Sequence, residues 1–239
     1  MPGPSVSHWT CAVPKAGSSE DDYEDASAVA SETWPVCAAV ADGATESVFA
    51  GDWATRLVRG VVETEATTAD AFATALPDWR DEWRRGRPSR AAERPWYVSA
   101  KVEEGAFATV LGLSLHADGG WRAVSVGDCC LFHVRGGEVV ESWPYAAAEA
   151  FTNRPDLVSS RPAQAVPAPR TTTGTWRPAV AAWLLETAPS SLRDLSEKSA
   201  RSRIATARTD GDLRNDDVTL LVLKLLPPAD PATGTAHEA

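Results

Sequence analysis

The sequence predicts an α+β fold in which antiparallel β-sheets are covered by helices. Two observations support this class. Strand-like apolar runs occur near both ends of the chain, and helical segments are grouped rather than alternating regularly with strands. A regular alternation would have favoured a doubly wound parallel sheet, whereas grouped elements favour antiparallel layers.

Three strands are predicted before the first helix. The last of them, VCAAVAD, is almost wholly apolar, which is typical of a strand buried inside a sheet. These predicted strands cover residues 8–13, 26–31 and 36–42.

Two long helices follow this third strand. In the segment 50–65, apolar side chains recur at the spacing of one helix face: Trp53, Leu57, Val58, Val61 and Val62. The second helix covers about 69–85, and its arginines near the C-terminal end suit the helix dipole. A third helical piece is predicted over 95–104.

The apolar period then changes to that of strands. A hairpin turn at Gly136-Gly137 joins the last two of four predicted strands, 106–116, 121–126, 129–135 and 138–143. The stretch 152–174 is rich in Pro, Thr and Ser and predicts a loop. Helices over 179–187 and 191–208, a strand over 217–225 and a disordered tail over 227–239 complete the prediction.

Composition restricts the function classes. The chain of 239 residues has a formal net charge of −10, which disfavours binding to nucleic-acid phosphates. No apolar run is long enough to span a bilayer, and the N-terminus lacks a signal-peptide pattern. We therefore expect a single domain over 1–226, present as a cytoplasmic monomer that binds neither nucleic acid nor membrane.

The four cysteines do not predict a metal site. No pair has the CxxC spacing of a zinc site, and no histidine clusters with them. Cys11 and Cys37 lie in apolar runs, so we expect them to be buried free thiols.

Acidic residues occur at four predicted strand ends. They are Glu24-Asp25, Asp42, Asp128 and Asp216-Asp217. Strand ends at one edge of a sheet lie close together, and converging carboxylates repel unless a cation lies between them. An oxygen-only set suits Mg²⁺ or Mn²⁺. Taken singly, each acidic residue is equally compatible with a simple turn or a charged strand start.

The order and context of these residues resemble the metal-dependent serine/threonine protein phosphatases of type 2C (the PPM family). YEDASAV, ADGATESVFAGDWATRLV, AFATVLGLSL, AVSVGDCCLFHVRGGEV and NDDVTLLVLKL resemble five motifs of that family, in the family's order, between about residues 8 and 225. Cys129 occupies a position where the family usually has serine.

The resemblance implies two antiparallel sheets packed as a sandwich, with helices on both outer faces and two Mg²⁺ or Mn²⁺ ions at one edge. By motif, Asp42 would bridge both ions, the Gly43 carbonyl would complete one shell, and Asp216 would bind directly. Glu24 and Asp25 would bind directly or through water, and Asp128 would serve a third, weaker ion. An activated water would attack phosphoserine or phosphothreonine of a protein substrate, opposing a Ser/Thr kinase.

Two departures from the family pattern bear on activity. The family commonly has an arginine before Glu-Asp to hold the phosphate, and here that position is acidic. Lys15, the nearest upstream cation, is the candidate to bind the phosphate in its place. A solvated surface lysine is the alternative for Lys15.

The second departure concerns a metal ligand. The family has an apolar strand ending in an Asp turn, which would lie between Pro178 and Ala181, yet no Asp occurs between Asp156 and Asp194. We therefore expect one weakened metal site and impaired hydrolysis. The alternatives are an inactive pseudophosphatase that binds a partner protein, and an α+β domain whose acidic turns are only turns.

Overall fold

The computed structural model describes residues 4–19, 22–45, 47, 49–86, 105–135, 138–147, 150–152, 154–176 and 196–226. The predicted helices over 95–104 and 179–187, the stretch between Pro178 and Ala181, and the tail over 227–239 lie outside these residues. The elements are β1 (Ser5–Val13), β2 (Ala26–Ala30), β3 (Val36–Gly43), α1 (Ala50–Thr64), α2 (Ala69–Gly86), β4 (Phe107–Leu115), β5 (Gly120–Val126), β6 (Leu131–Arg135), β7 (Glu138–Trp143), β8 (Val158–Ser159), β9 (Arg170–Thr175), α6 (Glu197–Asp210) and β10 (Val218–Leu226).

The largest sheet has six antiparallel strands. Its order is β2-β3-β4-β5-β9, and the short β8 also pairs with β4. Strand β4 is buried along almost its whole length, because both of its faces are covered. Strand β3 lies between β2 and β4 and is also mostly buried, which confirms the inner position predicted from its apolar sequence.

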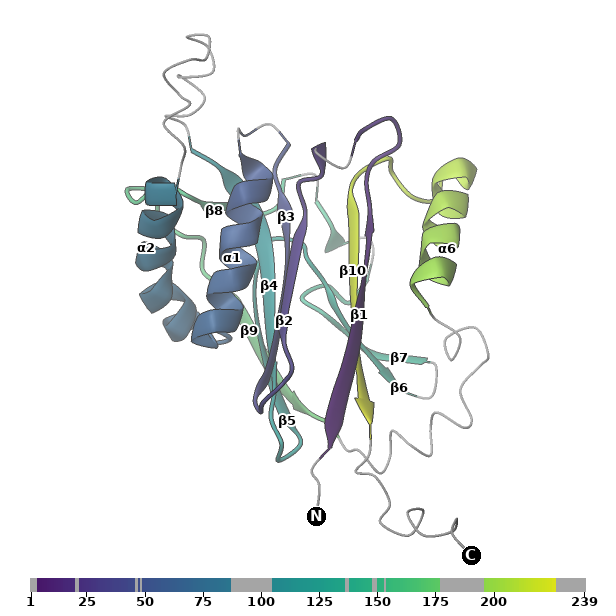
Figure 1. Ribbon diagram of the computed structural model, residues 1–239, viewed down its shortest axis with the longest axis horizontal. Helices are drawn as coiled ribbons and strands as arrows, with labels where there is room; N and C mark the ends of the chain where they lie inside the picture. Colours follow the sequence, from purple (N-terminus) through teal and green to yellow (C-terminus); the bar gives the residue numbers. More distant parts are fainter. Residues whose placement is uncertain are drawn as a thin grey trace, which may run out of the picture.

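The molecule is layered, as Figure 1 shows. Helices α1 and α2 cover one face of the large sheet, where Trp53, Leu57, Val58 and Val61 form part of one buried cluster. The β1–β10 pair and the β6–β7 hairpin form the second layer. A second cluster, which includes Leu113 and Trp121, fills the space between the layers.

Helix α6 lies outside this second layer and contacts β1 (Figure 1). Helices therefore cover both outer faces of two packed antiparallel layers. The predicted α+β sandwich is confirmed, and so are the two long helices, whose ends lie within one residue of the predicted ones.

The predicted loop over 152–174 is wrong. This segment contains β8 and most of β9, which pair with β4 and β5 respectively. The prolines that suggested a loop flank these strands, while the threonines of RTTTGT are β-branched residues that suit a pleated strand. The segment forms strands because it pairs with β4 and β5, which are distant in the sequence.

Two further expectations concern membrane-spanning helices and free thiols. Among the described residues, no helix is both long enough and apolar enough to cross a membrane. Cys11 and Cys37 are buried free thiols, as predicted.

Candidate active site

The strand register brings the acidic residues of two strands face to face. Ala26 of β2 pairs with Ala41 of β3, so the next position places Asp25 opposite Asp42. Asp42 pairs in turn with Thr109 of β4. Consecutive strands of an antiparallel sheet thus place Asp25, Asp42 and Thr109 in one row across its edge.

A small cavity lies at this edge. It has a volume of about 140 Å³ and is lined by Asp25, Val40, Ala41, Asp42, Cys129, Cys130, Asp217 and Thr219. Asp217 and Thr219 belong to the start of β10 in the second layer, so the cavity lies where the two layers meet.

Gly43 allows the chain before β2 to approach the end of β3. A Cβ atom at this position would lie 2.7 Å from the Glu24 carbonyl oxygen and 2.8 Å from the backbone carbon of Ala50. Neither backbone atom can move without shifting β2 or the start of α1. Glycine is therefore required here so that Glu24-Asp25 can lie against Asp42.

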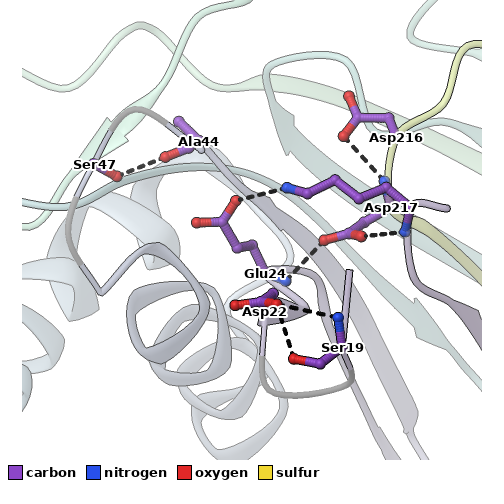
Figure 2. Close-up of polar contacts among 8 residues, drawn as sticks. Ser19, Asp22, Glu24, Ala44, Ser47, Asp216 and Asp217 are labelled. Atoms are coloured by element: carbon purple, nitrogen blue, oxygen red, sulfur yellow. Dashed lines mark hydrogen bonds and ion pairs between the residues drawn. The ribbon is translucent and has the colours of Figure 1, made fainter. Parts of the chain in front are cut away.

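The turn before β10 is bound to the segment that follows β1 and to the segment that precedes β2. Asp217 accepts hydrogen bonds from two backbone N–H groups, that of Lys15 on Oδ1 at 2.8 Å and that of Glu24 on Oδ2 at 3.0 Å. Figure 2 shows the Asp217 carboxylate between the two segments. Asp217 therefore fixes the position of Glu24 relative to β10.

Asp216 is more exposed than its neighbour. Its Oδ1 accepts the N–H of Asp217 at 3.0 Å, as Figure 2 also shows. The carbonyl of Asp216 accepts a hydrogen bond from Arg208 of α6, which also donates to the carbonyls of Pro14 and Val13 at 2.9 and 3.3 Å. Arg208 thus joins the end of β1 to the turn that carries Asp216.

Lys15 lies beside Glu24 rather than apart from the acidic residues. Its Nζ is 3.8 Å from Glu24 Oε2, and both side chains are largely buried. Burial raises the pKa of Glu24, and the charge of Lys15 partly offsets this effect. Lys15 is therefore a cation held at the border of the acidic site.

The acidic side chains at this edge are crowded and partly desolvated, although Asp42 itself is exposed. Loss of hydration at the cavity raises the pKa of Asp42 to about 8, with the charges of Asp25, Asp128 and Asp216 as further causes. Partial burial also raises the pKa of Asp25 to about 6; the hydrogen bond from Thr219 opposes this shift, and the charges of Asp217 and Asp216 add to it. The charge of Asp25 therefore makes ionisation of Asp42 more difficult.

Asp128 and Cys129 approach the same region from the end of β5. Burial raises the pKa of Asp128, and the charge of Asp216 adds to the shift. Cys129 Sγ lies 3.1 Å from Thr109 Oγ1, in the row next to Asp42. Burial raises the pKa of the Cys129 thiol, with the charge of Asp42 among the further causes.

The residues fit a divalent cation in donor type and charge. The acidic groups are carboxylates, and Asp25 Oδ1 is buried without a hydrogen-bond donor among the described residues. A bound cation would relieve the repulsion that raises these pKa values. Within the same part of the chain, no three His, Cys, Asp or Glu side chains are close enough to form a complete ligand set.

Only some of the predicted site residues line the cavity. Asp25 and Asp42 line the cavity, Asp128 and Asp216 interact with it electrostatically, and Glu24 lies at its border beside Lys15. Sequence reasoning named the Asp216-Asp217 pair but assigned metal binding to Asp216, whereas Asp217 lines the cavity. It missed Thr219 as a cavity residue, and Tyr23 as a partner of both Thr219 and Asp25. Strand alternation could have indicated Thr219, since it is two residues from Asp217 and so shares its face.

The comparisons with known proteins agree with this architecture. A model of the protein phosphatase 2C family matches residues 15–187. The serine/threonine phosphatase Stp1 from Staphylococcus aureus is similar with a TM-score of 0.58 and 11% identity, covering 95% of this chain and 97% of Stp1. The photosystem II phosphatase PBCP gives a TM-score of 0.53 and 17% identity, covering 92% of this chain and 98% of PBCP. At these identities the structural likeness shows the fold alone. No curated protein matches the sequence.

Proposed function

Because the chain belongs to the protein phosphatase 2C family, we propose that it hydrolyses phosphoserine and phosphothreonine on proteins, slowly, with Mg²⁺ or Mn²⁺ as cofactor. The similar solved structures are described as phosphatases, one of serine and threonine and one of photosystem II. We accordingly propose a phosphoprotein as the partner, one that a Ser/Thr kinase phosphorylates.

One observation carries this proposal. Asp25 and Asp42 face each other at the edge of the sheet, in a cavity that Asp217 closes from the second layer. Two carboxyls this close together are unfavourable in a structural role, because the charge of Asp25 raises the pKa of Asp42. The same arrangement is favourable for binding a doubly charged cation.

The proposed ligands are Asp25, Asp42 and Asp216, with Glu24, Asp128 and the carbonyl of Gly43 as further candidates. When bound, divalent cations make a nearby water more acidic and screen the charge of the phosphoryl oxygens. Asp217 is proposed to orient the site rather than to bind, since both of its oxygens already accept backbone N–H groups.

Lys15 is the proposed contact for the substrate phosphate. Its ammonium group lies at the border of the acidic site, where its partner Glu24 lies 3.8 Å away. A phosphate would have to compete with Glu24 for this cation. That competition is one reason for proposing slow turnover.

The second reason for slow turnover lies in the sequence. No Asp occurs between Asp156 and Asp194, the interval in which the family's pattern has a further acidic ligand. The same observation favours the second candidate function, an inactive family member that binds a partner protein. Metal binding separates the two candidates, because a partner-binding module has no need of the cation.

The proposal is tested by hydrolysis of a phosphothreonine peptide with Mn²⁺. We expect slow, Mn²⁺-dependent release of phosphate that Asp42→Asn reduces at least about tenfold. Release that is unchanged in Asp42→Asn would contradict the proposed site. Rapid turnover that Asp42→Asn abolishes would contradict only the proposed slowness.

A further inference from the structure

Three side chains form a chain of hydrogen bonds beside the cavity. The hydroxyl of Thr219 donates to Asp25 Oδ2 at 2.9 Å. The hydroxyl of Tyr23 makes a short contact with the same Thr219 oxygen. Tyr23 and Thr219 are 196 residues apart in the sequence, so this contact connects the segment before β2 to β10.

The number of hydrogens decides the direction of this chain. A hydroxyl has one hydrogen to donate, and Thr219 gives its hydrogen to Asp25. In the contact between the two hydroxyls, Tyr23 must therefore be the donor and Thr219 the acceptor. The other acceptors near Tyr23 are farther away, with the Val218 carbonyl at 3.3 Å and Asp25 Oδ2 at 3.4 Å.

We propose that Tyr23 is a positioning residue, which acts on Asp25 through the Thr219 hydroxyl. Asp25 Oδ2 is held by this chain, and Oδ1 is left buried without a donor among the described residues. A hydroxyl that accepts one hydrogen bond donates the next one more strongly. Tyr23 therefore strengthens the hydrogen bond that orients Asp25. Its effect on cation binding by Asp25 rests on the proposed function.

The backbone of Tyr23 packs closely against the start of α1. A Cβ atom on Gly51, in the first turn of α1, would lie 3.1 Å from the Tyr23 carbonyl oxygen.

A double-mutant cycle tests this role. Tyr23→Phe, Thr219→Val and the double variant are compared with the wild type by Mn²⁺ titration in a calorimeter and by urea unfolding without metal. We expect the dissociation constant to rise about 2- to 10-fold in Tyr23→Phe and about tenfold or more in Thr219→Val. The double variant should bind no more weakly than Thr219→Val, because both changes break one chain.

Two further variants separate positioning from general packing. Thr219→Ser keeps the hydroxyl and should bind Mn²⁺ nearly as the wild type does. Tyr145→Phe removes a hydroxyl that contacts the Gly127 carbonyl instead, and it should leave the dissociation constant unchanged. Additive effects in the cycle, or a Thr219→Ser variant as weak as Thr219→Val, would overturn the proposal.

The metal-free arm keeps this inference separate from the proposed function. If the wild type binds no Mn²⁺, the proposed cofactor is contradicted. The Tyr23–Thr219 coupling is then measured from the urea unfolding midpoints of the four proteins. Non-additive losses of stability there support the Tyr23–Thr219–Asp25 chain, whereas additive losses overturn it.

Discussion

Asp25, which directly precedes β2, lies opposite Asp42 of β3, and both line one cavity. Like charges directly across a strand pair destabilise a sheet. This pair therefore lowers the stability of the metal-free protein when both groups are ionised. The arrangement links the fold to the proposed chemistry, because a cation would remove the same penalty.

The first prediction concerns pH. The pKa values of Asp25 and Asp42 are raised, to about 6 and about 8, so the folded protein holds these protons more tightly than the unfolded chain does. Their contribution to stability is complete below the usual pKa of Asp and is lost as the pH rises through about 6 and about 8. Melting temperatures with a chelator present should fall over this range.

Asp42→Asn should flatten the upper part of this pH profile. Asp78→Asn, an exposed change on α2, is the control and should leave the profile as in the wild type. Mg²⁺ or Mn²⁺ should raise the melting temperature most at high pH, since a ligand of the folded state stabilises it. A wild-type profile that rises with pH between about 6 and about 8 would contradict the raised pKa values.

Gly43→Ala should destabilise the protein by about 1 to 3 kcal/mol, because the added methyl group would meet backbone atoms of Glu24 and Ala50 below 3.0 Å. The matched control is Gly86→Ala at the end of α2, where an added Cβ meets nothing within 4 Å. Urea unfolding compares the two variants. Equal midpoints would show that the Glu24 segment can move away from β3 at no cost.

Arg208→Met should lower stability by about 1 to 3 kcal/mol, because three carbonyl groups lose a charged donor. Arg201→Met is the control on the same helix, since its exposed ion pair with Glu197 contributes about 0.3 to 0.5 kcal/mol. Amide hydrogen exchange at Lys15 and Asp217 should quicken in Arg208→Met. Unchanged exchange there would exclude a role of Arg208 in fixing this turn.

The thiols offer a prediction that is independent of metal. Burial raises the pKa of all four cysteines, Cys11, Cys37, Cys129 and Cys130. Since the thiolate is the reactive form, iodoacetamide should modify the native protein more slowly than free cysteine at the same pH. Mass spectrometry measures the rate at each site, with the urea-unfolded protein as control. Rapid native labelling of Cys129 would contradict the raised pKa of its thiol.

Much of the fold follows from the sequence, because its elements are strongly patterned. The buried stripe of α1 and the apolar run of β3 were predicted from spacing alone and are found in the structure. Strands β8 and β9 were not predicted, since their polar, proline-flanked sequences carry little pattern. Their pairing depends on β4 and β5, which lie far away in the chain.

The site, like the fold, was predicted in part from the sequence and depends in part on contacts between distant segments. Acidic residues at strand ends predicted that Asp25 and Asp42 would meet, and the register places them opposite each other. The roles of Asp217 and Tyr23 depend on contacts across the two layers, such as the bond from the Glu24 N–H to Asp217 Oδ2. Sequence spacing carries no information on such contacts, because they arise only when the layers pack together.

The most direct test of the account is a calorimetric titration of Mn²⁺ into the wild type and Asp42→Asn. The account predicts saturable binding to the wild type and at least about tenfold weaker binding to the variant, because one of the two facing carboxylates is then neutral. Binding of equal strength in both proteins, or none in the wild type, would contradict the claim that Asp25 and Asp42 form a cation site.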